Sequence, residues 1–318
     1  MSGLAIVFPG QGSQFVGMGS LLRERVPAAR ERFAQADALL GIPLTEICQQ
    51  GPAEALNDTA LAQPAIYATT VALWEYLCTV WPADAPILGI AGHSLGEFAA
   101  LTAAGALAFE QGLLLVQQRG QAMAAAGAAE PGGMLAILGL GDELVQDLVR
   151  EAQACNQPVW VANYNAPGQV VVAGAHKGLA ALQSQASGHK GCRVMPLAVS
   201  VACHTPLMGP AANALSRALA DTPLTAARIP VISNVTAEPV TDPEEIRQAL
   251  LQQLVSPVRW VQSVRKMREL GADTILEVGP KSVLTGMIKR IDPEVAVTAL
   301  TDVAAIDEWV AARKEAAP

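Results

Sequence analysis

Short apolar runs alternate with longer helical patterns in the first part of the chain. Residues 4–8 form a continuous apolar run, and residues 87–91 form a second one. Runs of this length are typical of strands that are buried on both faces of a parallel sheet. Helical periodicity fills the intervals, and we expect helices at residues 21–40, 64–81 and 110–126, another from residue 97, and a turn at 82–86. The alternation predicts a parallel sheet covered by helices on both faces.

The pattern changes at a Gly- and Ala-rich stretch, residues 127–133, which we expect to be flexible. The expected order after it is strand, helix, two strands around a turn, helix and strand, the βαββαβ order of the ferredoxin-like motif. We interpret residues 128–198 as a small domain inserted into a large α/β domain of residues 1–127 and 199–318. The charged, Ala-rich residues from 302 onward predict a solvated terminal helix.

Composition narrows the possible classes of function. Of the 318 residues, 51% are apolar and 16% charged, which favours a folded chain with a sizeable core. No apolar run reaches the roughly 18–20 residues of a membrane span, and no basic segment precedes the first strand, so we expect neither a membrane helix nor a signal peptide. The net charge of -8 argues against nucleic acid as the main partner.

The cysteines point to a reducing compartment. They are five in number and form no CxxC pair, which suits reduced, buried thiols in the cytoplasm rather than disulfides. The five positions are Cys48, Cys78, Cys155, Cys192 and Cys203. No cluster with the spacing of metal ligands is visible either, so we expect no metal.

The strongest chemical signal is the Gly-His-Ser-Leu-Gly segment at residues 92–96. It matches GxSxG and falls between a predicted strand and a predicted helix, the context of a nucleophile elbow. Ser94 would lie at the tip of the turn, where backbone N–H groups at the start of a helix can hold an oxyanion. The alternative is a capping box, because Glu97 follows Ser94 by three residues. We favour the nucleophile.

A serine nucleophile needs a base, which is usually histidine. His93 is adjacent to the serine, so its side chain should point away from it. His176 and His189 lie in polar parts of the small domain, where solvated side chains are expected. His204 lies where a strand ends and a helix begins, and active-site residues of α/β sheets gather at such ends. We therefore expect His204 to be the base.

The third member of a hydrolase triad is missing from the sequence. Between Ser94 and His204 the only aspartates are Asp142 and Asp147, and both fall on a predicted surface helix of the small domain. A backbone carbonyl or an amide side chain is therefore expected to orient the base.

Arg119 is a charge at a position where the pattern predicts core. On the helix of residues 110–126 it shares a face with Leu115, Ala122 and Ala126. A buried arginine needs an anionic partner, and its planar fork suits a carboxylate held by two hydrogen bonds. That carboxylate belongs either to a substrate or to an internal salt bridge.

Taken together, these motifs resemble the malonyl-CoA:acyl carrier protein transacylases of type II fatty acid synthesis and the acyltransferase domains of polyketide synthases. The resemblance runs nearly from end to end and rests on several motifs in the family's order. They are Phe-Pro-Gly-Gln-Gly-Ser-Gln at residues 8–14, the GxSxG segment with Glu at 92–97, Gln-Arg-Gly at 118–120, Asn-Tyr-Asn-Ala-Pro-Gly-Gln at 163–169, residues 199–208, Pro-Val-Ile-Ser-Asn-Val at 230–235, residues 253–260, and Glu-Val-Gly-Pro at 277–280.

The resemblance implies an α/β-hydrolase-like core with a parallel sheet and an inserted ferredoxin-like domain. It implies that Ser94 is the nucleophile and that His204 is both base and acid. Gln253 would orient His204 through its main-chain carbonyl. Backbone N–H groups of Gln11 and Leu95 would form the oxyanion hole.

The resemblance also implies how the acyl group is chosen. Arg119 would pair with the free carboxylate of malonate, and Asn163 and Asn165 would lie near the site. Cys203 stands where many malonyl-specific polyketide domains carry Phe, which leaves room for a branched acyl group. Leu95 favours malonyl, so we expect malonyl.

The implied reaction moves a malonyl group from malonyl-CoA, through a serine ester, to the phosphopantetheine thiol of acyl carrier protein, with no cofactor. An acidic carrier would need a basic surface, for which the candidates are Arg265, Lys266 and Arg268, or Lys281, Lys289 and Arg290. The alternatives are a stand-alone polyketide acyltransferase, an editing acyl hydrolase of the same fold, and a non-catalytic carrier-binding subunit.

Overall fold

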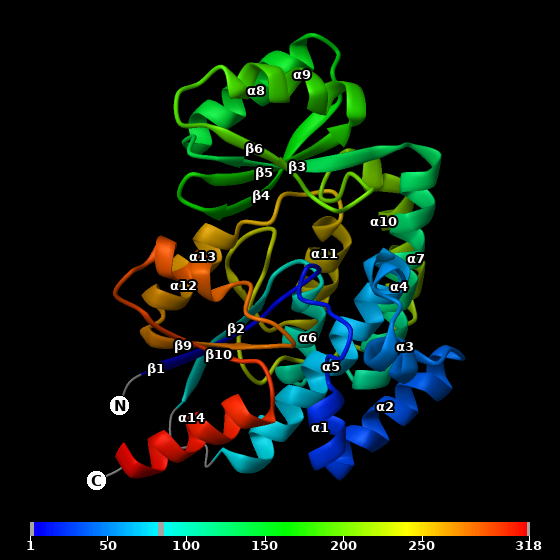
Figure 1. Ribbon diagram of the computed structural model, residues 1–318, viewed down its shortest axis with the longest axis vertical. Coiled ribbons are helices and arrows are strands. Elements are labelled where there is room, and N and C mark those ends of the chain that lie inside the picture. The colour runs from blue at the N-terminus through cyan, green and yellow to red at the C-terminus, as the bar shows by residue number, and fades with distance from the viewer. Residues whose placement is uncertain (1–2, 82–85, 317–318) are drawn as a thin grey trace.

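The computed structural model describes residues 3–81 and 86–316, so the turn expected at 82–86 lies almost entirely outside the described residues. Two sheets organise this part of the chain (Figure 1). The larger sheet has the strand order β10-β9-β1-β2-β7-β8, with parallel neighbours except for β7 and β8. Its strands are β1 (Gly3–Phe8), β2 (Ile87–Gly92), β7 (Val231–Ile232), β8 (Pro239–Val240), β9 (Ala272–Val278) and β10 (Ala296–Leu300).

Alternate residues of β1 face two different cores. Leu4, Ile6 and Phe8 belong to one cluster of buried side chains, whereas Ala5 and Val7 belong to another. Both faces of the sheet are therefore buried, which explains why this strand is an unbroken apolar run. Figure 1 shows the same division at the β9–β10 edge, where α12 and α13 lie above the sheet and α14 lies below it.

The helices that surround this sheet come from both ends of the chain. They are α1 (Ser20–Arg25), α2 (Pro27–Leu40), α3 (Leu44–Gln50), α4 (Ala53–Asn57), α5 (Thr59–Val80), α6 (Gly96–Ala103), α7 (Phe109–Ala129), α10 (Gly209–Ala220), α11 (Pro243–Gln253), α12 (Trp260–Glu269), α13 (Thr285–Ile291) and α14 (Val303–Ala316), with a short 3-10 turn, η1 (Pro206–Met208). None of the described helices is both long enough and apolar enough to span a membrane.

The smaller sheet has the antiparallel order β4-β5-β3-β6. Its elements follow the predicted βαββαβ order: β3 (Gly132–Leu138), α8 (Asp142–Ala154), β4 (Val159–Ala166), β5 (Gln169–Ala175), α9 (His176–Ser187) and β6 (Arg193–Pro196). Its outer face packs against α8 and α9 in a core of its own, and its other face turns toward the larger sheet (Figure 1). The predicted α/β core with a ferredoxin-like unit is confirmed. The limits of that unit, residues 128 and 198, stay a prediction.

Several boundary predictions were wrong. The helix expected to begin near Pro64 begins at Thr59, because the carboxylate of Asp58 caps it by accepting from the N–H of Ala60. Regular elements cover most of residues 127–133, since α7 continues to Ala129 and β3 begins at Gly132. The helix expected at 21–40 is two helices, which are separated before Pro27.

The terminal helix is docked rather than solvated. Val303, Ile306 and Val310 of α14 are buried against the core. Small residues and charges around these three positions hid the apolar stripe from the sequence pattern. The cysteines also differ from expectation: all are free thiols, but Cys78 and Cys155 are exposed.

Candidate active site

The GxSxG segment forms a tight turn between β2 and α6. Ser94 lies at its tip with φ of 51°, a left-handed conformation that is uncommon for residues other than glycine. The turn closes because Gly92 has no Cβ; that atom would lie 1.9 Å from the carbonyl carbon of Gly96. The alternative capping box is not formed, since α6 begins at Gly96 and its N-cap residue, Leu95, supplies no side-chain cap. The turn instead presents the Ser94 hydroxyl.

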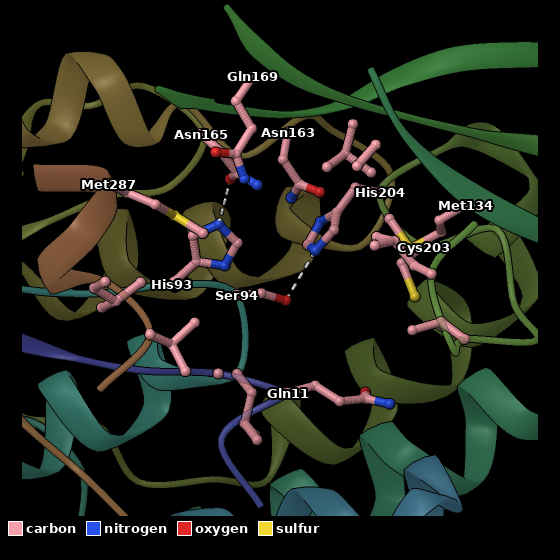
Figure 2. A pocket seen from close by; sticks show the side chains of 18 of the residues that line it. Gln11, His93, Ser94, Met134, Asn163, Asn165, Gln169, Cys203, His204 and Met287 are labelled. Carbon is pink, nitrogen blue, oxygen red and sulfur yellow. Dashed lines mark hydrogen bonds between the residues drawn. The ribbon is translucent and has the colours of Figure 1, made fainter. Parts of the chain in front are cut away.

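His204 meets Ser94 although 110 residues separate them in the chain. Its Nε2 lies 2.8 Å from Ser94 Oγ (Figure 2), and its Nδ1 lies 2.9 Å from the main-chain oxygen of Gln253. Because a carbonyl oxygen only accepts, Nδ1 carries the proton and Nε2 is free to accept one. Burial, reinforced by the charge of Arg119, lowers the pKa of His204 to about 3. The imidazole is therefore neutral at pH 7.

The other histidines do not contact the serine hydroxyl. His93 lines the same pocket, but its Nε2 lies 2.8 Å from Asn165 Oδ1, toward which the ring points in Figure 2. His176 is exposed and His189 is half-buried, which agrees with their expected place in the polar part of the small sheet's unit. Asp142 and Asp147 lie on α8, and the observed partner of His204 Nδ1 is the main-chain oxygen of Gln253.

Arg119 is buried without a carboxylate partner among the described residues. Its Nη1 donates to Gln63 Oε1 at 2.7 Å, and its Nη2 donates to Gln253 Oε1 at 2.9 Å and to Ser94 Oγ at 3.0 Å. Burial lowers the pKa of Arg119 to about 10, so the guanidinium still carries its charge at pH 7. The internal salt bridge, one of the two alternatives for Arg119 in the sequence analysis, is not formed. The guanidinium instead donates to neutral oxygens.

These groups converge on one pocket of about 220 Å³. Its lining includes the sequence-predicted residues Gln11, Ser94, Leu95, Arg119, Asn163, Asn165, Cys203 and His204. The smaller sheet adds Met134, Ala136, Gln169 and Val171, and the segment around α13 adds Val283, Leu284 and Met287. The pocket therefore lies between the two sheets, and of the predicted site residues only Gln253 stands behind its wall.

The loop after β1 packs directly against the serine turn. A Cβ at Gly10 would lie 2.4 Å from the carbonyl oxygen of His93, so only glycine allows this approach. The next residue, Gln11, lines the pocket and holds its side chain toward Thr59, whose Oγ donates to Gln11 Oε1 at 3.0 Å. Within the described part of the chain, no acceptor faces the backbone N–H of Gln11 or of Leu95. Two free donors thus border the serine.

Cys203 lies beside the histidine and is buried in the pocket wall. Burial raises the pKa of its thiol to about 11, so it is present as the thiol at neutral pH. It acts there as a small apolar side chain. Across the described residues, no group of three or more His, Cys, Asp or Glu side chains could hold a metal ion.

Sequence reasoning missed three polar residues at this site. Gln63 binds Arg119, while Glu97 and Asn234 are buried behind Ser94. Glu97 was considered as a helix cap and as part of a matching segment, and Asn234 only as part of a matching segment. A buried carboxylate that directly follows a GxSxG motif was the available signal, but its partners lie more than 130 residues away.

The chain matches known proteins over nearly its full length. Residues 5–302 match the family model described as "Acyl transferase domain", and the chain belongs to this family. It is 43% identical over 311 residues to the malonyl CoA-acyl carrier protein transacylase of Salmonella typhimurium, an alignment that covers 96% of this chain and 98% of the relative. The resemblance to malonyl-CoA:acyl carrier protein transacylases is thereby confirmed.

Solved structures of similar proteins support the same family. An acyl carrier protein S-malonyltransferase from Vibrio cholerae superposes with a TM-score of 0.91 at 42% identity, covering 96% of this chain and 99% of that one. A malonyl-transacylase in complex with a type II PKS acyl-carrier protein superposes with a TM-score of 0.93 at 39% identity, covering 98% and 100%.

Proposed function

We propose that this protein transfers a malonyl group from malonyl-CoA to the phosphopantetheine thiol of acyl carrier protein in fatty acid synthesis. One observation carries the proposal: an activated serine and a buried cation without a carboxylate partner share one pocket. The transacylases to which the chain is 43% identical support the choice of donor and acceptor.

In the first half-reaction, Ser94 Oγ attacks the thioester carbonyl of malonyl-CoA while His204 Nε2 takes the hydroxyl proton. The resulting oxyanion lies against the free N–H groups of Gln11 and Leu95. The C–S bond then breaks, the sulfur of CoA leaves with the proton from His204, and malonyl remains as an ester on Ser94.

The second half-reaction reverses the first with a different thiol. His204 Nε2 takes the proton of the carrier's phosphopantetheine thiol, whose sulfur attacks the ester carbonyl. Collapse breaks the bond to Ser94 Oγ, which regains its proton from His204. The main-chain oxygen of Gln253 holds His204 in the tautomer that both steps require. The phosphopantetheine belongs to the carrier, so the reaction uses no cofactor of the enzyme.

Arg119 selects the acyl group. In the structure its fork donates to neutral oxygens, one of which is the nucleophile itself. A malonyl carboxylate makes shorter, charge-assisted hydrogen bonds with a guanidinium and would take the place of the Ser94 hydroxyl on Arg119. An acetyl group has no carboxylate and cannot form these hydrogen bonds with Arg119. The cation therefore favours a carboxylated substrate and argues against an editing hydrolase of uncharged acyl groups.

The proposal is tested by intact mass spectrometry after mixing the protein with malonyl-, methylmalonyl- or acetyl-CoA. We expect one malonyl group on the wild type and none on Ser94→Ala. Adding acyl carrier protein should then move that group to the carrier. The proposal is contradicted if the wild type gains no mass. It is also contradicted if the malonyl-serine ester is hydrolysed to free malonate as fast as the malonyl group is transferred to the carrier.

A polyketide carrier is the second candidate acceptor, because the chain superposes at a TM-score of 0.93 on a malonyl-transacylase bound to a type II PKS acyl-carrier protein. Transfer rates to a fatty acid carrier and to a type II polyketide carrier, measured side by side, separate the two pathways. The cytoplasmic location stays a prediction from the cysteine pattern.

A further inference from the structure

The backbone of Ser94 is held on both sides by side-chain amides. Its N–H donates to Asn234 Oδ1 at 2.7 Å, and its carbonyl oxygen accepts from Gln253 Nε2 at 3.0 Å. Asn234 also donates through Nδ2 to the carbonyl oxygen of Gly92 at 2.6 Å, so it bridges the turn that carries the serine. These contacts fix a left-handed residue that is costly to hold without them.

A single carboxylate connects the two amide residues. Glu97 Oε1 accepts from the backbone N–H of Asn234 at 3.2 Å, and Glu97 Oε2 accepts from Gln253 Nε2 at 2.5 Å. The side chain is almost completely buried, with 2% of its surface exposed. Both of its oxygens face donors, an arrangement that only a carboxylate can satisfy fully.

The same carboxylate decides which way the Gln253 amide points. The amide lies between Glu97, which faces its nitrogen, and Arg119, which donates to its oxygen at 2.9 Å. A flipped amide would place its NH2 group against the guanidinium and its oxygen against the carboxylate. Opposite charges at its two ends therefore keep the oxygen of Gln253 directed at Arg119.

We propose that Glu97 is a positioning residue, which holds the turn around Ser94 through Asn234 and holds Arg119 through Gln253. It touches neither acyl group nor thiol, and it acts on both parts of the site that the proposed transfer uses. This inference rests on the proposed function. It explains why a carboxylate is buried one helical turn behind the serine, where a capping role is not observed.

Ionisation of Glu97 provides a readout that packing alone would not give. Burial raises its pKa to about 7, against the opposing effects of Gln253, the Asn234 N–H and the charge of Arg119 on α7. Tyr67 on α5 meets α6 at Thr102, away from this carboxylate. His204 remains neutral here because its pKa is about 3. Acylation should therefore fall as pH decreases through about 7, where Glu97 gains a proton that faces two donors.

The test variant is Glu97→Gln, which keeps the shape but replaces one acceptor by an NH2 group. We expect the rate of malonyl-serine formation at saturating malonyl-CoA to fall about 100-fold, the effect of misplacing a reacting group by about 1 Å. The decrease of the wild-type rate below about pH 7 should be absent from this variant.

The matched control is Thr102→Val on the same helix. It is also isosteric and removes a hydrogen bond from α6, the 2.7 Å contact between Thr102 Oγ and the Tyr67 hydroxyl. We expect a lower melting temperature for Thr102→Val, with the acylation rate and its pH profile unchanged.

A wild-type rate and pH profile in folded Glu97→Gln would overturn the inference. Should that variant not fold, Asn234→Asp decides, because it keeps the acceptor for the Ser94 N–H and puts a carboxyl oxygen in place of the NH2 group that donates to Gly92. A wild-type acylation rate in Asn234→Asp is then the overturning result, and a slow one supports the inference. A wild-type protein that never forms malonyl-serine refutes the proposed function instead, so the two failures are distinguishable.

Discussion

The two sheets contribute different things to one pocket. The larger sheet is buried on both faces and delivers the nucleophile and the Gln11 loop: the serine turn follows β2, and the Gln11 loop follows β1. The base, His204, lies in the segment between β6 of the smaller sheet and η1. The smaller, antiparallel sheet has one helical layer and an exposed edge strand, β6, and supplies wall residues such as Asn163 and Asn165 from β4.

This difference suggests a division of labour. The nucleophile must be held within fractions of an ångström, and a sheet packed on both faces provides that rigidity. Residues that only enclose a substrate tolerate larger shifts in position. We therefore expect changes near the larger sheet to lower the rate of acylation, and changes on the smaller sheet to raise the KM for malonyl-CoA.

The largest effect in this comparison is expected at Arg119, on α7, which packs against α5 and against α6, the helix that follows the serine turn. Arg119→Ala removes the charge-assisted bonds to the malonyl carboxylate and should lower kcat/KM for malonyl-CoA about 100-fold. Acetyl transfer should be unchanged or faster, because the Ser94 hydroxyl also loses a donor. The measurement is acyl transfer with both donors, with Arg119→Lys as a variant that keeps the charge but not the fork. Equal losses for both acyl groups would show that the carboxylate role is wrong.

A smaller effect is expected at Asn165 on β4. Its oxygen lies 2.8 Å from His93 Nε2, and removing a buried hydrogen-bond partner changes binding by about 1–3 kcal/mol. Asn165→Ala should therefore raise the KM for malonyl-CoA about tenfold, with little change in kcat. Tyr164→Phe is the matched control, because its hydroxyl bonds Gln146 outside the pocket lining. A fall in kcat with an unchanged KM would break the proposed division between the sheets.

The smallest effect is expected at the surface that meets the carrier. Lys266 pairs with Glu238 and Glu269, and Arg268 pairs with Asp292, so the candidate group on α12 is largely neutralised. Lys289 is exposed on α13, and that helix borders the pocket through Met287.

Lys289→Glu should accordingly raise the KM for the carrier about two- to fivefold, without changing the KM for malonyl-CoA. Lys314→Glu, on the distant terminal helix, is the control. An equal KM for the carrier in the two variants would show that α13 is not the docking surface.

Local patterns in the sequence determined a large part of this protein. Unbroken apolar runs identified β1 and β2, and the glycines around Ser94 encoded its turn, because backbone sterics act over a few residues. The βαββαβ order of the smaller sheet was also readable, as was Arg119 as a charge in an apolar stripe.

Only the tertiary structure decided which groups meet. His204 reaches Ser94 across 110 residues, Asn234 across 140 and Gln253 across 159, and no local pattern specifies such pairs. The docking of α14 and the burial of Glu97 were hidden for the same reason. Periodicity reports which face of an element is apolar, whereas the partner of each polar atom is fixed by the packing of distant segments against one another.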